Sequence, residues 1–528
     1  MKKIFSILLV CTALCSRAQQ NVFLDPSFWK ANPDVAAVKA AMEKGNDPAE
    51  YNRMSMDPVV IAINNQASTE TIKFLLAQKG NDVNKLTHDS RTYLFWAAVS
   101  GNADLVDHLL QKGAKMDVED SHGTTPITFA ANAGQKNTAI FDLFAKYGAD
   151  LKKVTNHDGA SLLLLAIAQD RDLALTNYFV AKGLDLNGTD NAGNTAFNYA
   201  AKSGNIELLK TLVDKGVKYT DNAFLMACQA GGGRGGGGGG PQGGGPQGGG
   251  QQGGGQAQQG RGGNPGGGRG PDFVALFQYL EGLKIKPTAV NSNGENALHL
   301  MARKPNQLPA LTYLIGKGVD VNKPDNDGNT PFMVACTSNR DTATIALLLA
   351  NVKNINQVNK KGVAALAMAV NSNAPVVISY LISKGADVKI KDGNGDNLAY
   401  YLVQSYSPQR GGFEDFDAKM KVLTDAGLDI TAAQKNGNTL YHLAIAKSDL
   451  ELLKRLESLK IDINAKNKEG LTVLHKAALT AKNDAILKYL VSIGAKKDIT
   501  TEFKETAFDL AAENEALTKN KTNIDFLK

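Results

Sequence analysis

The sequence has few cysteines and no long apolar run. Cysteine occurs four times in 528 residues, at positions 11, 15, 228 and 336. The first two lie in an N-terminal segment that we expect to be removed, and the other two are too few for a disulfide framework or a cysteine-based zinc site. No apolar run approaches the roughly 20 residues that a membrane-spanning helix needs. We therefore expect neither a disulfide-stapled nor a membrane-spanning protein.

The body of the chain also lacks an excess of charge of one sign. The formal net charge is +6, from 58 basic and 52 acidic residues. Six of the basic residues lie in the N-terminal segment or in a glycine-rich stretch, and without them 52 basic residues face 52 acidic ones. A neutral body gives no electrostatic reason to expect nucleic-acid binding. The six residues are Lys2, Lys3, Arg17, Arg234, Arg261 and Arg269.

The first eighteen residues have the pattern of a secretory signal peptide. Two lysines precede an apolar stretch over residues 4–14, and Ser16 and Ala18 place small side chains where a signal peptidase requires them. We expect cleavage after Ala18 and a mature protein that is periplasmic or secreted.

An internal repeat with a period of about 33 residues dominates the rest of the chain. Glycine-led stretches such as GTTPITFAA at Gly123, GNTPFMVAC at Gly328 and GLTVLHKAA at Gly470 recur along the sequence. A second landmark follows them, as in KGLDLN at Lys182 and KGVDVN at Lys317. The patterning within a repeat predicts two helices with one apolar face, and such units are stable only when they stack.

The period and these stretches resemble the ankyrin repeat, whose signature is about 33 residues around a T-P-L-H-x-A core. The Thr-Pro pairs at Thr125 and Thr330 and the histidines His299, His442 and His475 match that core. The resemblance, to exported bacterial members of the family, implies an all-α repeat solenoid with a β-turn or hairpin and two antiparallel helices in each repeat. It implies about thirteen repeats, which begin near residues 57, 87, 120, 155, 190, 221, 291, 325, 359, 392, 434, 467 and 501.

The register of the repeats divides the chain into segments. We expect an N-terminal half-repeat cap at 22–53, a first block of repeats at 57–230, a second block at 271–500 and a C-terminal capping repeat at 501–528. The ends need such caps because a stack of repeats otherwise leaves an apolar face in water.

The glycine-rich stretch 231–270 interrupts one repeat between its two helices. It contains 25 of the 53 glycines of the chain, together with glutamine, proline and three arginines. Because it has almost no apolar side chains to bury, we expect a disordered loop. The flanks 223–230 and 271–283 match a first and a second helix, and a smaller insertion near 405–416 lengthens a later repeat.

Three patterns that resemble chemical sites have structural explanations. The Gly-x-Gly-x-x-Gly spacings of the glycine-rich stretch lack the strand and helix of a phosphate site. The tip at 325–328 lacks the glutamate that completes a calcium loop, so turn formation explains its aspartates. In the ankyrin family, the histidine at the place of His299, His442 and His475 bonds between neighbouring turns. We expect no cofactor, no metal and no catalytic residue.

One place in the first helices carries an apolar side chain in repeat after repeat. Such a column suggests a ligand groove, but in the ankyrin family this place packs one repeat on the next. We expect the column to be core: Ile61, Trp96, Phe129, Leu165, Tyr199, Leu300, Val334 and Leu443.

Polar side chains at three successive hairpin tips are the candidate partner-binding residues. Adjacent repeats are spaced like packed helices, roughly 8 to 10 Å apart, which is too far for three imidazoles to share one zinc ion. A pH-sensitive contact patch and chance occupancy of variable tips both stay open. We expect these side chains to have no folding role and to face a partner. They are His88, Asp89, Arg91, His122, Asn156, His157 and Asp158.

The family resemblance implies a non-enzymatic scaffold that binds a protein partner. No serine, cysteine or acid pair stands in a nucleophile setting, and we expect no small-molecule substrate and a monomeric chain. The alternative is a nucleic-acid-associated scaffold acting through the glycine-rich stretch, where Arg234, Arg261 and Arg269 have RGG-like spacing. Three arginines without aromatic neighbours, in a chain that we expect to be exported, disfavour this alternative.

Overall fold

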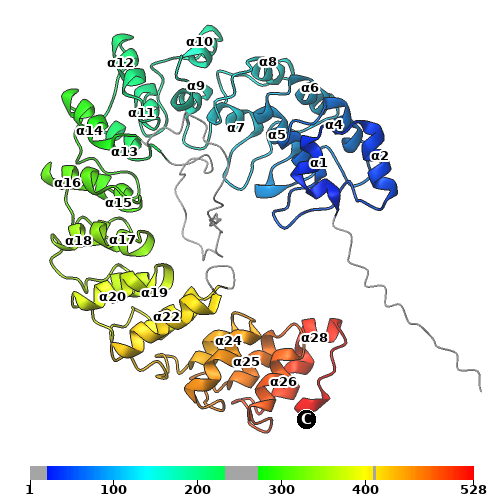
Figure 1. Ribbon diagram of the computed structural model, residues 1–528, viewed down its shortest axis with the longest axis vertical. Helices are drawn as coiled ribbons and strands as arrows, with labels where there is room; N and C mark the ends of the chain where they lie inside the picture. The colour runs from blue at the N-terminus through cyan, green and yellow to red at the C-terminus, as the bar shows by residue number, and fades with distance from the viewer. Residues whose placement is uncertain (1–20, 232–270, 408–411) are drawn as a thin grey trace, which may run out of the picture. The chain divides into compact units, whose positions relative to one another are not determined.

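The computed structural model describes residues 21–231, 271–407 and 412–528, which are built of short helices (Figure 1). They fall into two compact units, divided between Asp272 and Phe273. The expected signal peptide and nearly all of the glycine-rich stretch lie outside the described residues. Within the described ranges there are no strands, only three isolated bridges at the bases of hairpin tips.

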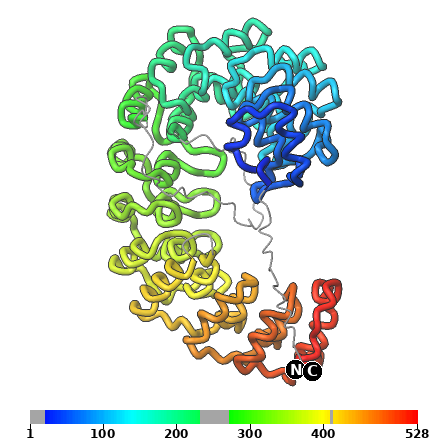
Figure 2. Tube along the Cα trace, turned by 45° about the vertical axis from the view of Figure 1, so that its right-hand side comes forward, coloured from blue at the N-terminus to red at the C-terminus, as the bar shows by residue number. Residues whose placement is uncertain are grey.

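Unit 1 alternates first helices, which stack on one another, with second helices that form a second layer. The tube in Figure 2 follows this alternation from repeat to repeat. The first helices are α1 (Pro26–Lys30), α3 (Pro58–Asn64), α5 (Tyr93–Ser100), α7 (Pro126–Asn132), α9 (Leu162–Ala166), α11 (Ala196–Ala201) and α13 (Asn222–Ala227). The second helices are α2 (Val35–Glu43), α4 (Thr69–Leu76), α6 (Ala103–Gln111), α8 (Ala139–Lys146), α10 (Ala174–Ala181) and α12 (Ile206–Asp214).

Unit 2 has the same two layers. It opens with the second helix α14 (Phe273–Gly282), and its first helices are α15 (Ala297–Ala302), α17 (Pro331–Ser338), α19 (Ala365–Ser372), α21 (Leu398–Ser405), α23 (Leu440–Ile445), α25 (Val473–Thr480) and α27 (Ala507–Glu513). Its other second helices are α16 (Leu308–Gly316), α18 (Thr342–Leu349), α20 (Pro375–Ser383), α22 (Gly412–Asp425), α24 (Leu450–Leu456), α26 (Ala485–Ser492) and α28 (Glu515–Lys519).

Short 3-10 turns complete both units: η1 (Val22–Leu24), η2 (His88–Ser90), η3 (Ile167–Gln169), η4 (Glu457–Leu459) and η5 (Asp525–Leu527). In chain order, thirteen helix pairs from α3 to α28 follow the N-terminal pair in the described residues, in agreement with the predicted repeat count. None of the helices within these residues has both the length and the apolar character needed to cross a bilayer.

The first helices begin where the sequence predicts. Thr330 caps α17 with Pro331 at its first position, and the Thr125 hydroxyl caps α7 in the same way ahead of Pro126. The second helices end at a glycine in the left-handed conformation, as at Gly385, where φ is 93°. Local sequence signals therefore place both ends of most helix pairs.

The N-terminal cap is a complete helix pair, which corrects the predicted half-repeat. Helix α1 packs on α3 and α2 packs on α4, so both layers begin in the cap. The fully buried side chains of Phe23 and Trp29 fill it, and the Trp29 indole N–H donates to the Phe23 carbonyl at 2.7 Å. Two aromatic side chains thus supply a core that the short helices alone could not provide.

The smaller insertion lengthens a second helix. Helix α22 has 14 residues and begins at Gly412, directly after four residues that the structure does not describe. Tyr406 packs against Phe413 and Phe416, with ring centroids 5.2 and 5.9 Å away. The extra residues therefore join the helical layer.

Candidate partner-binding surface

Most hairpin tips are closed by a side chain that accepts hydrogen bonds from the backbone of its own turn. Oδ1 of Asp120 accepts from the N–H groups of His122 and Thr124, both at 2.9 Å. Oδ1 of Asp325 accepts in the same way from the residues two and four positions later. Aspartate and asparagine suit this place because their short side chains reach the nearby backbone. The turn interpretation of the aspartate-rich tips is confirmed.

Backbone hydrogen bonds also join consecutive tips. Ser121 N–H donates to the Asp89 carbonyl at 2.8 Å, and Lys360 N–H donates to the Asp327 carbonyl at 2.9 Å. We call these bonds tip rungs, and we call the surface formed by the tips and the adjoining first helices the tip face. The other rungs in the described residues run from Asn191 to Asp158, Asn326 to Asn293, Gly393 to Lys361 and Lys468 to Asn436.

Arg91 is a buried structural residue, which corrects its assignment to an exposed contact surface. Its Nε donates to the Asp120 carboxylate at 2.8 Å, and its guanidinium lies 3.2 Å from Asp89. The guanidinium carbon also lies over the rings of Phe129 and Trp96, 4.3 and 5.5 Å from their centroids. The Arg91 and Asp120 side chains are 10% and 0% exposed. Arg91 therefore joins two neighbouring repeats and cannot be counted as a free contact residue.

Three other predicted site residues also have folding roles. Asp89 adopts the left-handed conformation and supplies the carbonyl of a tip rung. Oδ1 of Asn156 accepts from the Ala160 N–H at 2.8 Å and closes its turn. The carbonyl of Asp158 accepts the next rung. The expectation that these side chains are dispensable for folding is wrong for Asn156 and incomplete for the two aspartates.

The three tip histidines are the predicted residues that stay accessible. The side chains of His88, His122 and His157 are 36%, 41% and 64% exposed. Nε2 of His157 lies 3.2 Å from the Glu119 carboxylate, and its ring covers Gly123, where an added Cβ would come within 2.4 Å of it. In the described residues no group of three or more His, Cys, Asp or Glu side chains has a geometry suited to a metal ion.

The histidines of the ankyrin-like core have the structural role that the sequence predicts. Nδ1 of His475 accepts from the Thr472 N–H at 3.1 Å, and its Nε2 lies 2.9 Å from the Ile499 carbonyl at the next tip. His299 and His442 make the same two bonds in their repeats. Burial lowers the pKa of all three imidazoles. We call each of these arrangements a histidine tie, because it joins a first helix to the following tip.

The apolar column is mostly core, as predicted. Five of its eight members are buried: Ile61, Leu165, Tyr199, Val334 and Leu443. The other three, Trp96, Phe129 and Leu300, are half-buried. The two half-buried aromatic members, Trp96 and Phe129, pack against Arg91, so this part of the column forms the floor of the tip face.

A groove in unit 2 is the feature that the sequence did not reveal. It has a volume of about 400 Å³ and lies on the tip face across the first helices α17, α19 and α21. These helices contribute Val334, Thr337, Ser338, Met368, Asn371, Ser372 and Tyr401. The tips contribute Asp325, Asp327, Asn329, Asn359, Lys361 and Val363, and Arg303 follows α15.

The repeat of α19, at the middle of the groove, lacks the capping side chain and the tie histidine that other repeats have. Ala364 stands at the N-cap of α19 and makes no capping bond, and Ala367 occupies the place of the tie histidine. In α17 this place is Met333 and in α21 it is Tyr400. In the α19 repeat, alanine replaces both the Thr and the His of the core signature. This replacement is the signal in the sequence that could have indicated an unusual surface here.

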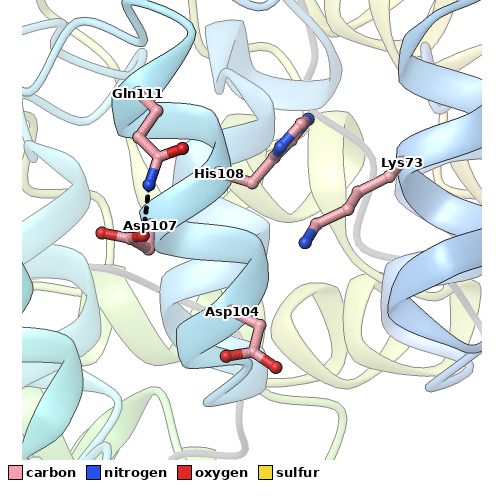
Figure 3. A pocket seen from close by; sticks show the side chains of 5 residues that line it. All are labelled: Lys73, Asp104, Asp107, His108 and Gln111. Carbon is pink, nitrogen blue, oxygen red and sulfur yellow. Dashed lines mark hydrogen bonds between the residues drawn. The ribbon is translucent and has the colours of Figure 1, made fainter.

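A smaller hollow in unit 1 lies in the second-helix layer (Figure 3). Its volume is about 130 Å³, and Lys73 of α4 faces Asp104, Asp107, His108 and Gln111 of α6 across it. One of its two carboxylates is already occupied, because Asp107 binds the Gln111 amide and the ammonium of a lysine from α8. The hollow is therefore part of the packing between repeats.

Comparison with protein families gives a match over most of the chain. A family model described as ankyrin repeats in three copies matches residues 30–120, 59–153, 128–223, 273–359, 298–392, 413–501 and 441–522. The matches include most of the helix pairs and leave out α21 as well as the glycine-rich stretch.

Individual relatives are more distant. The chain is 30% identical over 195 residues to the transient receptor potential cation channel subfamily A member 1 homolog of Caenorhabditis elegans, covering 37% of this chain and 15% of the relative. It is 22% identical to the human channel of that name over 84% of this chain and 31% of the relative. The phosphocholine transferase AnkX of Legionella pneumophila is 23% identical over 45% of this chain and 26% of its own length. The chain thus spans less than a third of these relatives.

Among solved structures, the ankyrin repeat domain of Bcl-3, described as a unique member of the IkappaB protein family, is similar to part of the chain. The match covers 44% of this chain and all of that domain, at 20% identity and a TM-score of 0.33.

Proposed function

This chain belongs to the ankyrin repeat family, and from that membership we propose that it is a non-catalytic scaffold that binds a protein partner through its tip face. Ankyrin repeats are protein-interaction modules, and stacking uses the apolar faces of their helices. The tip face is the surface that stacking leaves available.

The groove on unit 2 carries this proposal. It is a concave, three-repeat surface with both apolar and polar lining groups, which is the composition that protein and peptide recognition requires. The second-helix layer offers less, because many of its charges pair within the layer. Lys182 binds Asp142 at 2.6 Å in unit 1, and Lys317 binds Glu281 at 2.7 Å in unit 2.

We also propose that the mature protein acts outside the cytoplasm. This proposal rests on the N-terminal pattern alone, with its lysines, apolar stretch and small residues before Gln19. Mass spectrometry of the N-terminus after expression in a bacterial host with a periplasm tests it. A chain beginning at Gln19 in the periplasmic fraction is expected, and an intact N-terminus in the cytoplasm would contradict the proposal.

Cross-linking in the cell-envelope fraction of the native host tests the scaffold function. We expect a protein partner whose cross-links fall on tip-face residues, and we expect that binding withstands RNase and moderate salt. Cross-links confined to the second-helix layer would contradict the tip-face assignment. Retention on RNA that falls steeply with salt and disappears on deleting 231–270 would favour the nucleic-acid alternative.

A further inference from the structure

The groove of unit 2 contains charged groups that its own fold does not neutralise. The carboxylate of Asp327 and the ammonium of Lys361 have no ion-pair partner among the described residues, and both residues are exposed. Elsewhere in unit 2, several charged side chains of the second-helix layer are paired, as in the 2.8 Å ion pair between Lys421 and Asp425. The groove therefore has a positive and a negative group available for a ligand.

Two hydroxyl groups at the C-terminal end of α17 also line the groove, and both serve there as acceptors. The Thr337 hydroxyl donates to the Met333 carbonyl at 2.9 Å, and the Ser338 hydroxyl donates to the Val334 carbonyl at 3.0 Å. Each hydroxyl has one hydrogen, so both retain only lone pairs for a ligand. The α17 part of the groove, with Asp325 and Asp327 at its tip, thus favours a ligand that donates hydrogen bonds and carries positive charge. The Arg303 guanidinium also lines the groove, but it is paired with the Glu295 carboxylate.

The α19 part of the groove has the opposite preference. Lys361 lies at its tip, where its ammonium can bind only acceptors. Met368 from α19 and Tyr401 from α21 add half-buried apolar surface between the charged tips and the helix ends. The groove therefore changes from acidic to basic over one repeat, with an apolar surface alongside.

The spacing of the repeats fits an extended peptide. Neighbouring first helices pack roughly 8 to 10 Å apart, and three residues of an extended chain in the polyproline II conformation rise about 9 Å and complete one turn, which returns the side chain to the same side. Side chains three positions apart can therefore reach equivalent places in two successive repeats. Because Met333 of α17 and Ala367 of α19 replace the tie histidine, the tips at 359–363 and 392–396 lack this constraint, whereas the α17 tip is tied by His299 through the Asn329 carbonyl.

We infer that this groove binds an extended segment of the protein partner that carries a basic and an acidic side chain three residues apart, with an apolar side chain beside them. The basic side chain lies at the carboxylates of the α17 tip, and the acidic one lies at Lys361. This inference rests on the proposed scaffold function and specifies the segment that the scaffold recognises.

Selection from a phage-displayed library of random heptapeptides on the immobilised mature chain tests the inference. We expect enriched peptides with opposite charges three positions apart in one consistent order. In the variant Asp327→Lys/Lys361→Glu, which keeps the net charge, these peptides should bind about tenfold more weakly. Selection on that variant should enrich the reversed order of charges.

The double variant Lys421→Glu/Asp425→Lys is the matched control, because it exchanges an exposed pair of charges on α22, away from the groove. It should bind the selected peptides like the unmodified chain, and both variants should keep the melting temperature. Enriched peptides without the charge pattern, or equal binding by the groove variant, would overturn the inference. The scaffold function would survive that result if a native partner still cross-links to other tip-face residues.

Discussion

The charged tips of the two units are used in different ways. In unit 1, Arg91 is buried against two aromatic rings and bound to two carboxylates of neighbouring tips. In unit 2, Asp327 and Lys361 are exposed and have no ion-pair partner in the described part of the unit. Charged residues of the hairpin tips thus stabilise one unit and remain available on the other. Charge at a tip identifies a binding residue only when its partners are known.

Removal of Arg91 should have the largest effect. The substitution Arg91→Ala leaves the fully buried Asp120 carboxylate without its cation, and we expect a loss of about 3 kcal/mol in the free energy of unfolding of unit 1. Trp29 and Trp96, the two tryptophans of the chain, both lie in unit 1, so fluorescence during urea unfolding monitors it. The control His157→Ala should leave the midpoint in place. An unchanged midpoint for Arg91→Ala would show that the buried pair is not structural.

Loss of a histidine tie should have the next largest effect. The substitution His475→Ala removes one hydrogen bond at the N-cap of α25 and one between α25 and the following tip, and we expect a local destabilisation of about 2 kcal/mol. Hydrogen exchange of the α25 and α27 amides measures it. The control Lys482→Ala changes an exposed side chain in the same unit and should leave exchange unaltered. Equal exchange in both variants would contradict a role for the tie.

Acid should weaken unit 2 through the same histidines. Burial lowers the pKa of His299, His442 and His475, so the unfolded chain takes up protons, near its ordinary pKa of 6.5, before the folded chain does. Stability is then full above about pH 6.5 and falls as the pH drops below it. Hydrogen exchange of unit 2 at pH 7.5 and 5.5, corrected for intrinsic rates, should show the fall. In His475→Ala this acid effect should be smaller, and an undiminished effect would point to other groups.

A missing cap can be restored in the repeat beneath the groove. The substitution Ala364→Thr supplies the hydroxyl that Thr330 provides in the preceding repeat, and we expect about 1 kcal/mol of stabilisation. Ala364→Val is the matched control, because valine has nearly the shape of threonine and no hydrogen-bond acceptor. Slower exchange of the α19 amides in the threonine variant alone is the expected result. Equal exchange in the two variants would mean that packing, not capping, limits this helix.

Removal of the Asp327 carboxylate should have the smallest effect on stability. Asp327→Ala should change the stability of unit 2 by no more than about 0.5 kcal/mol, because the tip rung uses only its backbone. Asp325→Ala is the matched comparison, since that side chain closes the turn through two hydrogen bonds. Thermal melts should rank Asp325→Ala as the more destabilising change. The opposite ranking would contradict the availability of Asp327 for a ligand.

The repeat register could be predicted because its signals are local. A Thr-Pro pair, a core histidine or a terminal glycine each acts within one turn of a helix, so the helix pairs followed from the sequence. The N-terminal cap has a capping residue before Pro26 and a left-handed glycine at Gly45, but it has no core histidine, and its core depends on the burial of Phe23 and Trp29, which only the folded cap shows.

The candidate site was harder to predict because its contacts cross repeats. The role of Arg91 depends on Asp120, 29 residues away, and on aromatic rings from two different helices. The groove likewise combines single side chains from three repeats, such as Val334, Met368 and Tyr401, none of which is unusual in its own repeat. A one-dimensional pattern records the position of each residue in its repeat but not the partners that stacking brings to it.

The tip rungs have a consequence for how such a chain can change during evolution. Each rung is formed by a backbone N–H and a backbone carbonyl, as between Lys360 and Asp327, and every residue except proline can supply both groups. A mutation at the donor or acceptor position therefore alters the chemistry offered to a partner while the link between neighbouring repeats persists. Selection for a new partner can act on these positions one at a time, without first having to compensate for a weakened stack.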